Sequence, residues 1–204
     1  MFRSEDAWIK TYKQKGALWL HDGNVKRPHA LLSAGDHSTG FFNSELVMED
    51  PLLLDEACAD LVELFVTYCG TADLEVVDRV VGPAMGAITL AHDVARHIGH
   101  TRGRPCLRAY TEKATRGENN IMIFSRTSIR EGECILRAED VLTTGNSVDL
   151  AAHAVVEKKG IVFPVVLVLV NRSGLKEVNG MRLIALIDRP MPNWAPDACP
   201  SCKA

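Results

Sequence analysis

The sequence predicts one α/β domain built on a mostly parallel, twisted sheet that helices cover on both faces. Strand-like and helix-like segments alternate from residue 74 to residue 188. The strand-like segments are nearly continuous runs of Val, Ile and Leu, which is typical of parallel strands buried on both sides. The length agrees, because 204 residues suit a single domain with a substantial core.

Three parts are expected within this domain. Residues 1–48 form an N-terminal extension, about 49–190 the α/β core, and 191–204 a C-terminal tail. In the extension, a helix is predicted over 4–15 and a short strand in ALWLHDGN (17–24), which ends in an Asp-Gly turn.

The helix that opens the core has clear end signals. Asp50 is placed to cap it, Pro51 suits its first turn, and the helical period ends before Gly70. Two later helices are predicted over 84–99 and 147–160. Strands are predicted over 74–83, 104–111, 121–126, 133–140, 162–172 and 181–188.

Composition and charge argue against several functional classes. A net charge of -3 gives no electrostatic footprint for a nucleic acid. No apolar run approaches the ~20 residues of a membrane span. The first residues lack the apolar core of a signal peptide. We therefore expect no nucleic-acid or membrane partner, and a cytoplasmic location.

The six cysteines fall into two groups. Four stand alone in largely apolar segments and are predicted to be buried small hydrophobes. Cys199 and Cys202 have metal or redox spacing, but no second cysteine pair completes a tetrahedral zinc site. We predict a structural or incidental role for them, with a metal shared across a dimer as the alternative.

The segment ILRAEDVLTTGNSV (135–148) carries the strongest chemical signal. Its loop, 143–147, places hydroxyls and backbone N–H groups at the start of a helix, which favours an anion. Glu139 and Asp140 end the strand, and carboxylates there suit the vicinal hydroxyls of a sugar, with Mg²⁺ nearby. The pattern predicts a phosphorylated sugar as ligand, and its alternative is a plain strand–turn–helix corner.

This segment resembles the phosphoribosyl pyrophosphate (PRPP) site of type I phosphoribosyltransferases. The resemblance implies that family's fold, with a small hood formed by residues 1–48. Arg137 departs from the family, which has an aliphatic residue there, and we expect it to pair with a neighbouring carboxylate. The implied PRPP contacts in this segment are Glu139, Asp140, Leu142, Thr143, Thr144, Gly145, Asn146 and Ser147.

Three further segments resemble the orotate branch of this family. VVGPAMGAITLA (80–91) is similar to the loop that wraps the pyrophosphate, although alone it predicts only a strand-to-helix turn. In the hood, Phe41 and Phe42 stand where aromatics pack on the pyrimidine, with core packing as the alternative for one of them. Arg172, in VNRSG, matches an arginine that contacts the orotate carboxylate; a surface arginine in a turn is its alternative. Thr143 is a further implied orotate contact, and the implied pyrophosphate contacts are Pro83, Ala84, Met85 and Gly86.

The stretch YTEKATRGENN (110–120) resembles the family's mobile loop. Lys113 matches the first lysine and is the candidate catalytic cation, while Arg116 takes the place of the second. Glu112 replaces an arginine, the family's histidine is absent, and Ser33 stands where many relatives have a lysine. The alternative is a solvated hairpin.

The resemblance implies an orotate phosphoribosyltransferase, with Lys113 and Asp140 as catalytic residues and Mg²⁺ as cofactor. Orotate would displace pyrophosphate from PRPP to give orotidine 5′-monophosphate, a step of de novo pyrimidine (UMP) biosynthesis. A homodimer is expected. Two alternatives stay open: a phosphoribosyltransferase for another nucleobase, and a non-catalytic PRPP-sensing homologue.

Overall fold

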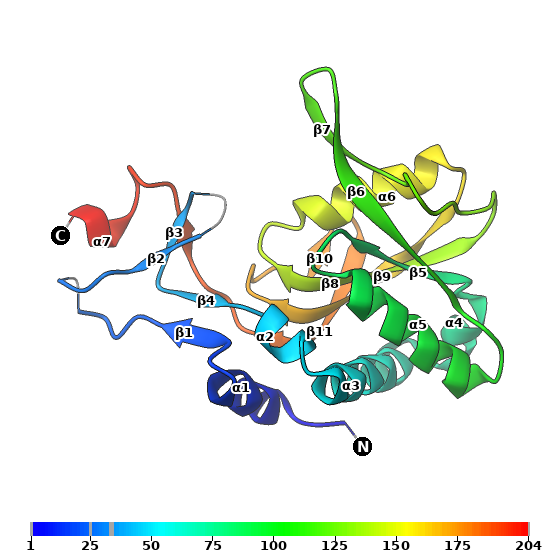
Figure 1. The fold of residues 1–204 in the computed structure, drawn as a ribbon, viewed down its shortest axis with the longest axis horizontal. Helices are drawn as coiled ribbons and strands as arrows, with labels where there is room; N and C mark the ends of the chain where they lie inside the picture. Colours follow the sequence, from blue (N-terminus) through cyan, green and yellow to red (C-terminus); the bar gives the residue numbers. More distant parts are fainter. Residues whose placement is uncertain (1, 25, 33–34, 204) are drawn as a thin grey trace.

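The computed structural model describes residues 2–24, 26–32 and 35–203. The predicted mostly parallel sheet, with helices on both faces, is confirmed (Figure 1). Five central strands run parallel, and the two edge strands are antiparallel to their neighbours. The spatial order is β10 (Glu177–Val178), β11 (Met181–Asp188), β9 (Ile161–Asn171), β8 (Cys134–Leu142), β5 (Arg79–Pro83), β6 (Leu107–Arg116) and β7 (Asn119–Ile123).

The strand order reverses between β5 and β8. From β5 the chain moves to β6 on one side, whereas from β8 it moves to β9 and β11 on the other. The loops that leave two such strands diverge and open a crevice beyond their carboxyl ends, where open α/β sheets bind ligands. The topology therefore places the loops after Pro83 and Leu142 on either side of one crevice.

Helices cover both faces of the sheet (Figure 1). On one face lie α3 (Pro51–Cys69) and α5 (Ile88–Arg102), and on the other lies α6 (Asn146–Glu157). The predicted cap of α3 is confirmed, because the Asp50 carboxylate accepts hydrogen bonds from the first-turn N–H groups. Within the described residues, no helix combines the length and apolar character needed to cross a membrane.

The predicted N-terminal helix is also confirmed as α1 (Glu5–Gln14), with Ser4 as its cap. Its Trp8 is fully buried, and the indole nitrogen donates to the Asp60 carboxylate on α3 at 2.8 Å. Beyond α1, two small sheets form the hood. One pairs β1 (Leu18–Leu20) with β4 (Gly40–Phe42), and the other pairs β2 (Ala30–Leu31) with β3 (His37–Ser38).

The C-terminal tail joins the hood, which the sequence did not predict. Its strand β12 (Asn193–Trp194) pairs with β3 on the side away from β2. The short helix α7 (Pro200–Lys203) follows, so this part of the tail lies beside the hood (Figure 1).

Three predicted element bounds were wrong. The strand predicted over 74–83 starts only at Arg79, because the chain turns at Gly70 and forms α4 (Thr71–Val76), which buries Leu74. The helix predicted over 84–99 starts only at Ile88, after a turn. Earlier in the chain, the short helix α2 (Glu45–Met48) precedes α3. The polar stretch predicted as a loop continues β6 and β7, which form one hairpin.

Arg137 has a different partner from the expected carboxylate. Its side chain is 1% exposed, and its guanidinium donates to the carbonyls of Phe163 and Val165 at 2.6 and 3.2 Å. The β8–β9 register shifts here, where Pro164 brings no N–H to the ladder. Arg137 therefore satisfies carbonyls at an irregularity in the centre of the sheet, and burial lowers its pKa to about 10.

We expect Arg137→Leu to lower the free energy of unfolding by about 2–4 kcal/mol, because two buried carbonyls lose their donor. Urea unfolding followed by circular dichroism measures the change. The matched control is Arg182→Leu, since Arg182 is exposed on β11 and should leave stability within about 0.5 kcal/mol of the parent. Equal stability of Arg137→Leu and the parent protein would show that the guanidinium does not hold this irregularity together.

Candidate active site

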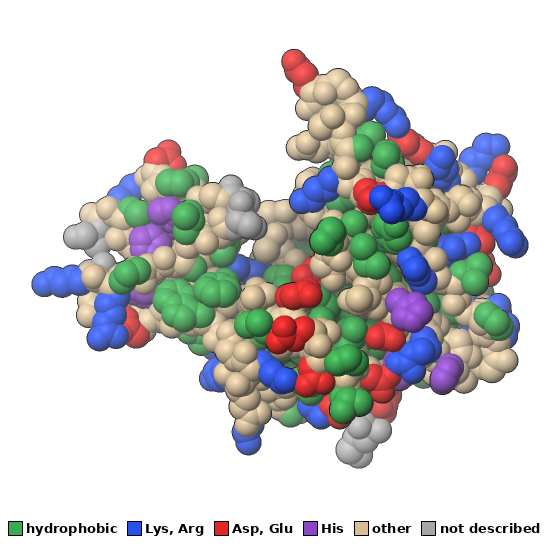
Figure 2. Space-filling view, viewed as in Figure 1, with side chains coloured by type: hydrophobic (Ala, Val, Ile, Leu, Met, Phe, Trp, Pro, Cys, Tyr) green, Lys and Arg blue, Asp and Glu red, His purple; other side chains and the backbone are tan. Residues whose placement is uncertain are grey.

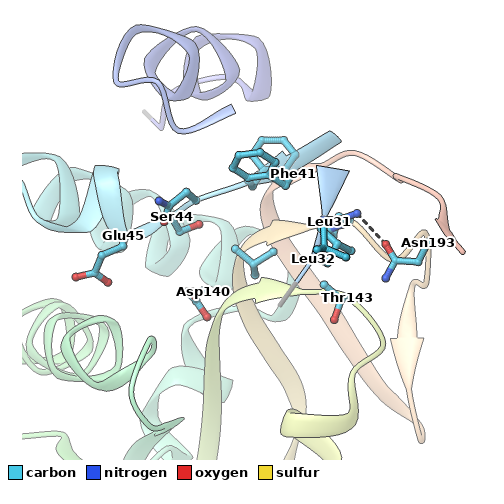
Figure 3. Close-up of a pocket in the computed structure, with 12 residues that line it drawn as sticks. Leu31, Leu32, Phe41, Ser44, Glu45, Asp140, Thr143 and Asn193 are labelled. Atoms are coloured by element: carbon cyan, nitrogen blue, oxygen red, sulfur yellow. Dashed lines mark hydrogen bonds between the residues drawn. The ribbon is translucent and has the colours of Figure 1, made fainter. Parts of the chain in front are cut away.

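A cavity of about 450 Å³ lies between the hood and the carboxyl ends of the core strands. Figure 2 shows acidic side chains gathered near the junction of the two lobes, and Figure 3 shows the lining residues converging from hood, core and tail. The cavity collects five of the predicted site residues in one place. These five are Phe41, Phe42, Asp140, Thr143 and Arg172.

The two loops at the strand-order reversal touch each other. A side chain at Gly86 would put its Cβ 2.9 Å from Oδ2 of Asp140, so glycine lets the backbone of the 83–86 loop approach that carboxylate. Glycine is needed at Gly82 as well, because a Cβ there would lie 2.2 Å from the carbonyl oxygen of Ala87. The predicted pyrophosphate loop thus lies against the predicted ribose-binding acid.

The predicted phosphate loop turns sharply into α6. Gly145 has φ +82° and packs against Val178, so a side chain at this position is disfavoured by both backbone and space. Thr143, Thr144 and Asn146 are exposed, which leaves their polar groups accessible to a ligand. Leu142 differs from this group: its side chain is buried in the core, and its carbonyl accepts the N–H of Arg172 at 3.0 Å.

Glu139 is a buried acid at the end of β8, with 6% of its surface exposed. Burial is the main reason that its pKa lies well above the ordinary glutamate value, and the neighbouring Asp140 charge raises it further. Lys113 opposes this shift. Burial therefore stabilises the neutral form of Glu139 relative to its carboxylate, while Asp140 is partly exposed at the cavity.

Arg172 is a buried cation at the carboxyl end of β9. It is 3% exposed, and its Nη2 donates to Ser38 Oγ and Asn193 Oδ1, each at 2.8 Å. In the described part of the chain, no carboxylate lies within 4 Å of it, and no acceptor takes up Nε or Nη1. Burial lowers its pKa. A charge held in this way favours an anionic group in the adjacent cavity.

The two hood phenylalanines have different environments. Phe42 is 7% exposed and meets Tyr12 edge to face at 5.6 Å between ring centroids, so it packs in the core. Phe41 is 37% exposed and stacks on Trp19 at 5.9 Å. Phe41 presents an aromatic surface at the cavity (Figure 3), and its cross-strand neighbour Trp19 stacks against it.

The two predicted cations of the β6–β7 hairpin also have different environments. Lys113 lines a second cavity, of about 180 Å³, together with Asn146 and Ser147 at the start of α6. Arg116 makes a two-pronged ion pair with Glu157 at 2.8 and 3.2 Å, on the far end of α6. In this arrangement Lys113 faces the predicted phosphate loop, whereas Arg116 is held by a carboxylate.

Sequence reasoning missed several lining residues. Glu45 and Ser44 enter from α2 and its cap, and Leu31 enters from β2 (Figure 3). The tail contributes Asn193, which only the β12–β3 pairing brings to the cavity. No local motif marks these positions, because each depends on how the hood folds over the core. Ser33 lies outside the described residues. The remaining missed lining residues are Leu32, Asn43 and Val141.

The donors at the cavity fit a hard divalent cation such as Mg²⁺. Asp140 and Glu45 offer carboxylate oxygens at the cavity, and these are the ligands that Mg²⁺ prefers. Arg172 lines the same cavity as these two acids, whereas Lys113 lines the second cavity beside the start of α6. The site can hold a sugar–phosphate chain and a separate planar anion.

Several known proteins are similar to this chain. No protein-family model matches it. The orotate phosphoribosyltransferase of Caldicellulosiruptor saccharolyticus is 34% identical over 200 residues, which cover 98% of this chain and 92% of the relative. The orotate phosphoribosyltransferase of Thermus thermophilus is 32% identical over 186 residues, or 91% and 93% of the two chains.

Solved structures share the fold. Orotate phosphoribosyltransferase from Aeropyrum pernix aligns with a TM-score of 0.64 at 22% identity, covering 87% of this chain and 91% of that one. An adenine phosphoribosyltransferase aligns with a TM-score of 0.61 at 16% identity, covering 88% and 99%. Because enzymes for two bases share this fold, the fold does not show which base is used.

We expect Glu139→Gln to stabilise the protein at pH 8 by about 1–3 kcal/mol. At that pH the buried glutamate must either carry a charge or take up a proton on folding, whereas the amide is always neutral. The raised pKa means that wild-type stability falls as pH rises above the ordinary glutamate pKa, so the gain should vanish near pH 4. Urea unfolding at both pH values measures it. Glu131→Gln, at an exposed surface pair, is the control. A gain of the same size at pH 4 would contradict this assignment.

Proposed function

The chain belongs to the orotate phosphoribosyltransferase family, and we propose that it transfers the phosphoribosyl group of PRPP to orotate. The products would be orotidine 5′-monophosphate and pyrophosphate, in the de novo route to UMP. Identities of 32–34% over more than nine-tenths of the chain support the family. The choice of orotate rests in addition on the cavity.

Arg172 is the observation that carries this choice. A buried guanidinium with free donors beside a 450 Å³ cavity suits a planar carboxylate, which it can bind through two parallel hydrogen bonds. Orotate is a pyrimidine that bears such a carboxylate, whereas uracil and adenine lack one. Phe41 offers an aromatic surface in the same cavity, on which the pyrimidine ring would pack.

The loops at the strand-order reversal would hold PRPP. The 143–147 loop receives the 5′-phosphate on hydroxyls and helix N–H groups. Asp140, with Glu139 once it ionises, accepts hydrogen bonds from the ribose hydroxyls. The 83–86 loop, in contact with Asp140, lies where the pyrophosphate would leave.

Catalysis in this proposal is mainly positioning and charge stabilisation. A nitrogen of orotate attacks C1 of the ribose as the bond to pyrophosphate breaks, through a transition state with oxocarbenium character. Lys113 is the cation that would stabilise the departing charge if the β6–β7 hairpin closes over the site, which would also exclude water. Arg116 would join it only after release from Glu157.

Mg²⁺ is part of the proposal. When bound, it would neutralise the charge that develops on the departing pyrophosphate. Asp140 and Glu45, whose side chains line the cavity, are the residues that would hold it.

A homodimer and a cytoplasmic location complete the proposal. The β6–β7 hairpin projects from the body of the chain (Figure 1), as a segment that reaches a partner would. None of the six cysteines forms a disulfide, which supports a reducing compartment.

The direct test of the reaction is the loss of orotate ultraviolet absorbance in the presence of PRPP and Mg²⁺. We expect consumption that requires both PRPP and Mg²⁺, with an assay lacking added Mg²⁺ as control. PRPP binding without any consumption of orotate would overturn the proposal and favour another base or a sensor role.

We expect Arg172→Gln to raise the KM for orotate by roughly 30-fold or more, because removing one partner of a desolvated charged pair costs about 2–5 kcal/mol. The KM for PRPP should change by less than about threefold. Arg172→Lys keeps the charge but loses the planar fork, so its KM for orotate should lie between those of the wild type and Arg172→Gln. Arg182→Gln, far from the cavity, is the control. An unchanged orotate KM would remove Arg172 from substrate binding.

We expect Asp140→Asn to lower kcat/KM for PRPP by about 100-fold, because the amide cannot replace the carboxylate toward the ribose hydroxyls and Mg²⁺. Initial rates at varied PRPP and Mg²⁺ measure the effect. Asp6→Asn, an exposed acid in α1, is the matched control. Rates equal to the wild-type enzyme would exclude Asp140 from the mechanism.

A further inference from the structure

Two histidines of the hood and two cysteines of the tail converge outside the cavity. His29 directly precedes β2, His37 opens β3, and Cys199 and Cys202 flank the start of α7. One potential ligand atom from each residue lies within 4.8 Å of the other three. Histidine side chains are visible together in the hood lobe in Figure 2.

The distances agree with tetrahedral coordination. His29 Nε2 lies 2.8 Å from His37 Nδ1 and 3.5 Å from each cysteine sulfur, and His37 Nδ1 lies 3.3 Å from Cys202 Sγ. Four ligands around one zinc ion, at about 2.0–2.3 Å from it, lie about 3.3–3.8 Å from one another. A small expansion of the two imidazoles would therefore admit the ion.

The hood sheet explains how the four residues meet. The β2–β3 register pairs Leu31 with His37, so His29, two residues earlier, lies diagonally opposite His37 on the same face. On the other side of β3, Trp194 pairs with His37 and directs the tail back over that face. The turn between Cys199 and Cys202, closed by an N–H···O bond of 3.2 Å, then presents both sulfurs.

The donor chemistry selects zinc. Two cysteine thiolates and two neutral imidazoles are a Cys₂His₂ set, which zinc binds tetrahedrally, and the two thiolate charges neutralise the ion. The cysteine spacing, C-x-x-C, is the one that structural zinc sites use. Four protein ligands leave no open position, so the site is structural and not catalytic.

The hood needs such a cross-link. Its strands β2, β3 and β12 have two residues each, too few to form a stable sheet without further support. Leu31 and Asn193, both in these strands, line the cavity, and Ser38 holds Arg172. An ion that fixes the tail on the hood would thereby fix one wall of the cavity.

We propose that His29, His37, Cys199 and Cys202 bind one structural zinc ion that fastens the C-terminal tail to the hood. The sequence contains no second cysteine pair, and the two hood histidines take that place. Zinc binding displaces the thiol protons of Cys199 and Cys202, which pass to solvent. No oxidation state changes. This zinc site does not depend on which base the enzyme uses.

The test is metal content, measured by mass spectrometry on untagged protein purified without chelators. We expect about one zinc ion per chain that survives gel filtration, and less than about 0.2 in Cys202→Ser and His29→Asn. Cys69→Ser and His100→Asn, which lie on α3 and α5, are the matched controls and should keep the metal. Full zinc content in both ligand variants, or none in wild type after reduction and addition of Zn²⁺, would overturn the proposal.

A second measurement does not depend on the variants folding. Wild-type protein loaded with Co²⁺ should show the intense thiolate-to-metal absorption and visible bands of tetrahedral cobalt, and Zn²⁺ should displace them. Zinc-free protein should also be cut faster by chymotrypsin after Trp194, which would release residues 195–204. A weak octahedral cobalt spectrum would contradict a Cys₂His₂ site. Formation of a Cys199–Cys202 disulfide while Zn²⁺ is present would contradict it as well.

Discussion

The organisation of this site depends on one buried charge. Arg172 lies at the carboxyl end of β9, 3% exposed, and its guanidinium donates to Ser38 in the hood and Asn193 in the tail. Its backbone N–H donates to the carbonyl of Leu142, next to the 143–147 loop. Core, hood and tail therefore meet at a single cation. In the described residues that cation has no carboxylate partner, so a substrate carboxylate would complete it.

The strand order determines the other half of the site. Because the chain reverses between β5 and β8, the 83–86 loop and the 139–147 segment face one crevice. Gly86 lets the first loop lie against the Asp140 carboxylate. In the proposed reaction, the sheet would supply groups for a sugar–phosphate chain, and the hood would supply groups for a base. A transferase needs both sets at a fixed distance, which explains why the small hood must be held firmly.

The sequence predicted the parts of the site that are local. The acidic pair and the phosphate loop lie in one strand–loop–helix segment, so their arrangement follows from adjacent residues. The rest depends on contacts between distant segments. Cys199 and His29 are 170 residues apart, and no spacing rule connects them. The partners of Arg137 follow from a register shift near Pro164, and residues 74–76 form a helix despite a strand-like pattern because tertiary packing outweighs propensity.

In the proposed reaction, a buried cation selects a carboxylated pyrimidine. The most direct measurement compares kcat/KM for orotate and for uracil with saturating PRPP and Mg²⁺. Uracil keeps the ring and lacks only the carboxylate, so it would leave Arg172 buried and unpaired. A preference for orotate on the order of 10⁴ is the predicted result. Equal use of the two bases would contradict the account and leave the charge of Arg172 without a role in substrate choice.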